Sequence, residues 1–201
     1  MKPTDILSSE HRVIEQVLAC LAKIAENAEA QGRLDKHAAE QAVDFFRAFA
    51  DHCHHGKEEA HLFPAMEAAG FSRSQGPTGV MLREHEQGRA HVRAMAEAIG
   101  PASAGDAAAV RRFAEHARGY IALLGAHIQK EDHVLFAMAN QALSPEEQQT
   151  LLAAFQKVES EEMGEGTHEK YLAIANDLAD RFGVPQAELA HAGHHGCGCG
   201  H

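Results

Sequence analysis

The chain carries one arrangement of histidine and glutamate twice. The segment HHGKEEAHLF at residues 54–63 matches HIQKEDHVLF at residues 127–136, and in each a histidine lies four residues before a glutamate. A Glu-His pair precedes each copy, so that His11 lies 43 residues before the first copy and His85 lies 42 residues before the second. Residues four apart share one face of a helix. The candidate metal ligands are His11, His54, Glu58, His85, His127 and Glu131.

These four imidazoles and two carboxylates form the kind of ligand set with which a four-helix bundle holds two metal ions in its core. Mixed imidazole and carboxylate ligands suit iron, manganese or zinc, whereas a structural zinc site more often uses thiolates. Carboxylates that bridge favour a site with two metals, and iron is our first choice because of its redox chemistry. We therefore predict two iron ions as cofactors, with manganese or zinc as the alternatives.

Helical spacing places the candidate ligands among apolar residues. His11 shares a stripe with Leu7 and Ile14, and His127 shares one with Leu124. Such stripes face a core, where helix carbonyls are already bonded and a buried imidazole needs another partner. One core histidine alone is usually a satisfied structural residue. The same arrangement on four helices, with two carboxylates that could not both stay ionised in a core without a cation, favours metal ligands.

Composition bounds the class of protein. A chain of 201 residues fits one domain with a substantial core. The formal net charge of −11 argues against nucleic-acid or anionic-membrane partners, which need a basic surface. No stretch approaches the ~20 apolar residues of a membrane span, and the N-terminal segment lacks the apolar core of a signal peptide. We therefore expect a cytoplasmic protein, and the four cysteines do not suggest a disulfide framework.

Apolar residues recur at intervals of three and four, which predicts an all-α protein without strands. We expect an antiparallel up-down-up-down four-helix bundle, with core helices at about 4–31, 35–69, 77–100 and 105–141. An additional C-terminal helix at about 145–182 should begin at a Ser144 capping box. Gly164 and Gly166 should interrupt this helix, and Thr167 should cap its second part. The helix should pack outside the bundle. Residues 1–183 would then form the helical domain. Residues 184–201, rich in Gly, His and Cys, would form a flexible, disordered tail that is inert or scavenges metal.

Three segments resemble the hemerythrin family, specifically its bacterial hemerythrin-like (HHE cation-binding) branch. They are CHHGKEEAHLFP at 53–64, EHEQGR at 84–89 and HIQKEDHVLF at 127–136. The resemblance covers most of residues 5–180. It implies a non-haem di-iron centre in an antiparallel bundle, with the two glutamates as bridges between the metals.

The second helix leaves a choice of register. His55 with Glu59 has the same spacing as His54 with Glu58. We prefer the latter pair, because a Leu-Phe dipeptide follows Glu58 at the same distance as it follows Glu131.

The chain departs from the oxygen-carrying hemerythrins at one position. Those proteins place a second histidine one turn after the ligand that corresponds to His85, whereas this chain has Arg89 there, preceded by Gly88. One iron would then lack a nitrogen ligand and bind an exchangeable molecule. Tyr120 either approaches the site or is an ordinary core tyrosine, and Glu15 either orients an imidazole or lies on the surface.

We therefore expect a non-haem di-iron protein that binds or senses a small ligand, namely oxygen, nitric oxide or peroxide. The alternatives are a di-iron enzyme that detoxifies peroxide or nitric oxide, and an iron storage or delivery protein aided by the tail. Helical phase places three further histidines near the ligands at the surface or behind the site: His52, His61 and His133.

Overall fold

The computed structural model describes residues 1–158 and 166–187. These residues are almost entirely helical, and no strand occurs among them. The prediction of an all-α protein is therefore confirmed for the described part of the chain.

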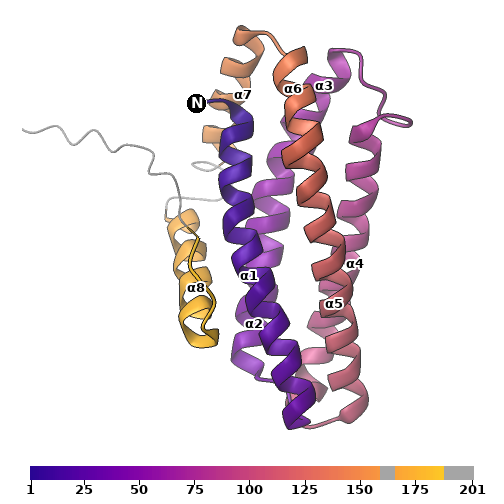
Figure 1. The fold of residues 1–201 in the computed structure, drawn as a ribbon, viewed down its shortest axis with the longest axis vertical. Coiled ribbons are helices and arrows are strands. Elements are labelled where there is room, and N and C mark those ends of the chain that lie inside the picture. Colours follow the sequence, from indigo (N-terminus) through magenta and orange to yellow (C-terminus); the bar gives the residue numbers. More distant parts are fainter. Residues whose placement is uncertain (159–165, 188–201) are drawn as a thin grey trace, which may run out of the picture.

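Four long helical segments make up most of the molecule, and in Figure 1 they lie side by side with their connections at alternate ends. Each of them contacts two of the others. In chain order they are α1 (Pro3–Gln31); α2 (Lys36–Phe45) continued by η1 (Phe46–His55), η2 (Glu58–Leu62) and α3 (Phe63–Ala68); α4 (Pro77–Ser103); and α5 (Ala107–Lys130) continued by η3 (Glu131–Leu135) and α6 (Phe136–Ala142).

Polar side chains and glycine set several of the helix ends. The carboxylate of Asp35 accepts from the Ala38 N–H at the start of α2, and Asp106 caps α5 in the same way. Gly32 ends α1 in the left-handed conformation, with φ of 65°. The predicted end of the third helix near residue 100 is too early, because Pro101 lies inside α4, within its last turn.

The sequence pattern predicts regular α-helices for the second and fourth segments, but the structure differs. These segments contain the π-helical stretches η1, η2 and η3, in which backbone N–H groups bond five residues back. These stretches hold both copies of the repeated His-Glu pattern or adjoin it. π-helical turns are rare and often occur at functional sites.

The core is divided by a layer of buried polar residues. A large hydrophobic cluster includes Ile14 and Phe49, and a smaller one includes Leu7, Leu62 and Leu135. In each long segment the candidate ligands occupy positions between members of the two clusters. The predicted ligands are thus embedded in the core rather than at its edge.

Two further helices pack against the long segments from outside (Figure 1). α7 (Pro145–Lys157) contacts α1 and η2, and α8 (Thr167–Phe182) contacts α1 and α2. The predicted capping box is present, since the Ser144 hydroxyl and the Glu147 carboxylate accept from each other's backbone N–H. Gly166, with φ of 80°, takes the N-cap position of α8, so Thr167 is the first helical residue rather than the cap. Gly164 lies outside the described residues.

The chain stays in contact with the core beyond α8. Val184 and Ala187 pack against the large hydrophobic cluster, and the Ala187 N–H donates to the Gln16 side chain. These contacts involve residues 184–187, the first four residues of the predicted flexible tail, and the flexibility of the tail stays a prediction. The remainder of the predicted tail, including Cys197 and Cys199, lies outside the described residues.

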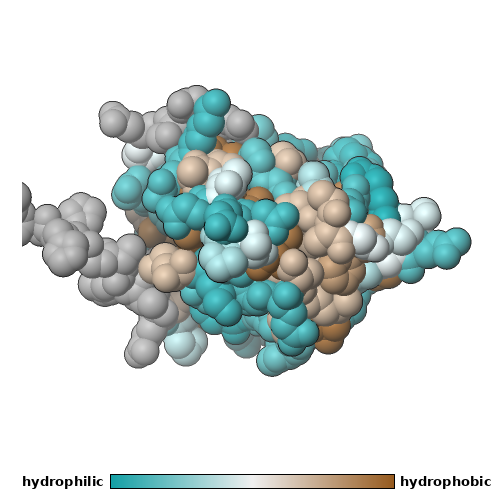
Figure 2. Space-filling model, turned by 90° about the horizontal axis from the view of Figure 1, so that it is seen from above, coloured by the Kyte–Doolittle hydropathy of each residue, from teal (hydrophilic) through white to brown (hydrophobic). Residues whose placement is uncertain are grey.

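Viewed from the end at which α1 begins, the surface mixes hydrophilic residues with a broad hydrophobic area (Figure 2). None of the helices among the described residues combines the length and the apolar character needed to cross a membrane.

The packing of α7 generates a stability prediction. Phe155 on α7 is fully buried in the smaller hydrophobic cluster, so Phe155→Ala should lower the free energy of unfolding by roughly 3–5 kcal/mol, measured by urea denaturation. Phe182→Ala is the matched control, because Phe182 is only partly buried beside the large cluster, and it should cost clearly less. Little or no loss in Phe155→Ala would show that α7 is not an integral part of the core.

Candidate metal centre

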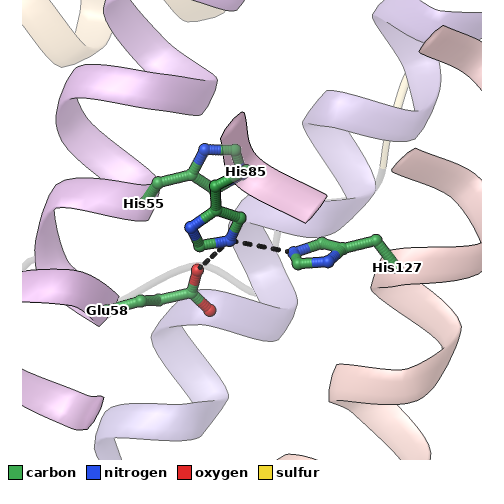
Figure 3. Close-up of side chains that lie close together, drawn as sticks. All are labelled: His55, Glu58, His85 and His127. Carbon is green, nitrogen blue, oxygen red and sulfur yellow. Dashed lines mark hydrogen bonds and ion pairs between the residues drawn. The ribbon is translucent and has the colours of Figure 1, made fainter. Parts of the chain in front are cut away.

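Two groups of buried side chains lie side by side in the polar layer. The ligand atoms within each group all lie within 4.8 Å of one another, which is close enough to surround one metal ion. The first group contains His11, His54, Glu58 and Glu131, and the second contains His55, Glu58, His85 and His127. Figure 3 shows the second group, with His55 and Glu58 on the same helical segment and His127 facing them across the site.

The π-helical turns explain how adjacent residues join one centre. In an α-helix, neighbouring side chains point in directions far apart, so only one of His54 and His55 could face the core. A π-helical turn contains more residues, so neighbouring side chains diverge less around the axis. η1 ends at His55, and η2 begins at Glu58. As a result His54 and His55 are both buried, one in each group.

Each glutamate faces both groups. The two oxygens of Glu58 lie 3.8 Å from His54 Nε2 and 3.5 Å from His85 Nε2. The two oxygens of Glu131 lie 3.2 Å from His127 Nε2 and 3.2 Å from His11 Nε2. This is the placement expected of carboxylates that bridge two metal ions.

Every imidazole of the two groups forms a hydrogen bond through Nδ1, on the side away from the centre, to a carboxylate. The contacts are His11 Nδ1 to Asp132 Oδ1 at 2.9 Å, His54 Nδ1 to Glu10 Oε2 at 2.8 Å, His55 Nδ1 to Asp51 Oδ1 at 3.3 Å, His85 Nδ1 to Glu59 Oε1 at 2.7 Å and His127 Nδ1 to Glu84 Oε2 at 2.8 Å. An ionised carboxylate only accepts, so each Nδ1 carries the proton and donates it. Each Nε2 then faces the centre, and in the neutral imidazole it carries the lone pair, as in carboxylate–histidine–metal triads.

Basic side chains balance these outer carboxylates. Lys57 and Lys130, equivalent positions of the two repeats, form ion pairs with Glu10 and Glu84 respectively. Arg12 pairs with Asp132.

Arg89 joins two of the outer carboxylates. Its guanidinium donates to Asp51 at 2.9 Å and to Glu59 at 2.8 Å, and these residues hold His55 and His85. Arg89 therefore lies behind the second group and supports two of its three imidazoles.

The pKa values of Glu58 and Glu131 are shifted in opposite directions. Burial, together with the negative charge of Glu131, raises the pKa of Glu58 well above its usual value. Burial also opposes ionisation of Glu131, but the nearby charges of His127 and His11 hold its pKa well below the usual value. Burial alone would lower the pKa of His11, whereas Asp132 and Glu131 raise it to about 9.

Other imidazoles are held neutral. Burial lowers the pKa of His55 to about 4, and burial together with the neighbouring His55 lowers the pKa of His85 to about 3. A neutral imidazole is the form that ligates a metal.

The centre presents buried polar atoms that the described residues leave without a hydrogen-bond partner. They are His11 Nε2, His55 Nε2 and both carboxylate oxygens of Glu58 and of Glu131. The short distances to Glu131 given above lack hydrogen-bond geometry. Leaving so many polar atoms unsatisfied in a core is costly, and a divalent cation placed against each group would satisfy them together. The donor set, rich in imidazole with shared carboxylates, fits iron, manganese or zinc.

The structure brings all six predicted ligands together in these groups, and their role as ligands stays a prediction. It adds His55, which the sequence reasoning left outside the ligand set. The only signal for His55 was its spacing from Glu59, and that signal was ambiguous. Glu59 does not face the centre but holds His85 from behind.

The expectation that one metal would lack a nitrogen ligand beside Arg89 did not take account of His55, and it stays untested. His55 Nε2 supplies a third imidazole to the group that contains His85 and His127. The group with fewer imidazoles is instead the one formed around His11 and His54.

Several residues near the site have other roles. Tyr120 is buried against Phe46, with ring centroids 4.9 Å apart, and it belongs to neither group of ligand atoms. Glu15 pairs with Arg12 at 2.7 Å and so acts on the centre only at a distance. His52 and His133 are exposed, and His61 is partly exposed, as expected.

Comparison with known proteins agrees with the geometry. The chain is 24% identical over 182 residues to uncharacterised proteins of Mycobacterium tuberculosis and Mycobacterium bovis, over 90% of this chain and 70% of each relative. No solved structure matches the chain significantly. Residues 2–139 match the hemerythrin HHE cation-binding domain. The chain therefore belongs to the hemerythrin HHE cation-binding domain family.

Proposed function

We propose that this protein holds two iron ions in an antiparallel up-down-up-down four-helix bundle and binds or senses a small ligand there. The observation that carries the proposal is the pair of buried ligand groups that share Glu58, with Glu131 facing an imidazole of each. Membership of a cation-binding family supports a metal, and the mixture of imidazole and carboxylate supports iron first. Iron bound there would supply redox chemistry and coordination of oxygen, nitric oxide or peroxide.

The chain's own residues give the two metal positions different surroundings. Three imidazoles, from His55, His85 and His127, belong to one group, and two, from His11 and His54, to the other. The position with fewer protein donors is the better candidate for an exchangeable ligand.

Apolar side chains shield the centre from water. Phe136 stacks on His11, with ring centroids 5.5 Å apart, and Phe63 stacks on His85 at 5.9 Å. A dry, apolar surrounding strengthens electrostatic interactions at the metals and limits access to small neutral or compact molecules.

Metal stoichiometry gives the first test. Purified protein without an affinity tag, truncated after residue 187 so that the terminal histidines and cysteines are absent, should contain about two iron ions per chain. Elemental analysis with an optical spectrum measures this. One ion per chain, or zinc alone after growth in iron-rich medium, would contradict the di-iron assignment. Sustained turnover of hydrogen peroxide by the loaded protein would favour the enzyme alternative over ligand binding.

Substitutions at the carboxylates separate bridging from supporting roles. Glu58→Ala and Glu131→Ala should each abolish binding of at least one metal ion, because each removes a donor to both positions. Glu59→Ala should weaken metal affinity by roughly 10–100-fold without abolishing it, because Glu59 only orients His85. The exposed Glu115→Ala is the control and should leave metal content unchanged. Chelator competition measures the affinities, and loss of metal in Glu59→Ala with full retention in Glu58→Ala would reverse the assigned roles.

The adjacent histidines provide a matched pair of variants. His55→Ala should lower metal affinity by at least about tenfold, since it removes one of three imidazoles from its group. His52→Ala, three residues earlier and exposed, should behave as wild type. If His55→Ala also retains wild-type metal content and affinity, His55 is not a ligand.

A further inference from the structure

A pocket lies beside the candidate metal centre, between the second helical segment and α4. Its volume is about 160 Å³, and its inner wall is apolar, formed by Phe46, Val92, Gly88 and the ring of Tyr120. His55 also lines it, so the pocket reaches one of the imidazoles of the centre.

The charged residues of the pocket are mostly basic. Three guanidinium groups line it, from Arg47, Arg89 and Arg93, against the single carboxylate of Asp51. The protein as a whole is acidic, with 29 Asp and Glu residues against 18 Lys and Arg. A local excess of arginine in such a chain marks a place where negative charge is attracted.

Two of these arginines are available to a ligand. Arg47 and Arg93 are exposed, and within the described residues neither forms an ion pair or a side-chain hydrogen bond. Arg89 is different, because it is paired with Asp51, Glu59 and Glu86. Asp51 is likewise occupied, because Arg89 and His55 both donate hydrogen bonds to its carboxylate.

Gly88 keeps the pocket open. A Cβ atom at this position would lie 3.3 Å from Cε2 of Tyr120, which is a tight contact. Glycine within a helix costs about 1 kcal/mol relative to alanine. Gly88 is buried in the middle of α4, where its small size leaves space for the tyrosine ring and the pocket.

The volume limits the ligand. At about 160 Å³, the pocket is small. Pockets for drug-sized molecules or nucleotides are larger, at about 300–1,000 Å³. The forked geometry of guanidinium groups matches the paired oxygens of an oxyanion or carboxylate.

We propose that this pocket is a binding site for a small oxyanion, separate from the metal positions and held by Arg47 and Arg93. The anion would sit with its charge at these two guanidinium groups and its body against Phe46 and Val92. Arg89 and Asp51 connect the pocket to His55, so an anion bound there would alter the support of one metal ligand.

Calorimetric titration of the metal-loaded protein with sodium nitrate tests the proposal. Ionic strength is held constant with sodium chloride, whose anion lacks the paired oxygens of an oxyanion. Nitrate should bind saturably at one site per chain. Arg47→Gln combined with Arg93→Gln should weaken binding by at least about tenfold. Arg83→Gln combined with Arg111→Gln removes the same charge at exposed positions outside the pocket and should leave the affinity within about twofold of wild type.

Gly88→Val gives an independent arm, because it places methyl groups in the pocket without changing charge. It should abolish nitrate binding, while metal content, measured on the same sample, stays at the wild-type level. The proposal is overturned if wild type shows no saturable binding, or if either pocket variant binds nitrate as wild type does. Metal content is determined separately in every sample, so a failure of the di-iron proposal would be seen independently of the anion result.

Discussion

Two carboxylates buried in a helical core impose the constraint on which the rest of this structure depends. Glu58 and Glu131 are fully buried, and among the described residues their oxygens have no hydrogen-bond partner. An uncompensated charge of this kind would destabilise the fold severely, and a bound cation would allow both carboxylates to be ionised. Carboxylates bind the imidazoles that surround this position, and lysine and arginine side chains pair with those carboxylates. This order of charges would stabilise such a cation.

The sequence repeat builds this arrangement twice, but with different exposure. Lys57 and Lys130 support equivalent carboxylates, yet Lys57 is fully buried under Phe155 of α7, whereas the side chain of Lys130 is 40% exposed. His55 breaks the repeat further, because the equivalent position in the second copy is Ile128. The two copies of the motif therefore form an asymmetric centre, because only one copy has the extra histidine, His55, and only one is covered by α7.

Much of the fold and part of the site followed from sequence. Helical periodicity, the Asp and Ser caps and the repeated His-Glu spacing were sufficient to predict an all-α chain and six of the seven residues that meet at the centre. The pairing of His54 with Glu10 was not predictable, because it depends on the relative rotation of two helices. The contribution of His55 could not be predicted, because at 3.6 residues per turn only one of two adjacent residues faces the core. Nothing in the local sequence signals the π-helical turn that brings His55 inward.

The π-helical turns and the metal centre are best understood as one feature. A π-helical turn has poorer backbone packing than an α-helical turn and persists where side-chain interactions favour it. Here η1, η2 and η3 all adjoin or contain a candidate ligand. Reverting to regular α-helix would rotate either His54 or His55 out of the core and leave its partner, Glu10 or Asp51, without an imidazole. Because binding free energy at such a site is also folding free energy, metal binding would stabilise the irregular backbone that creates the site.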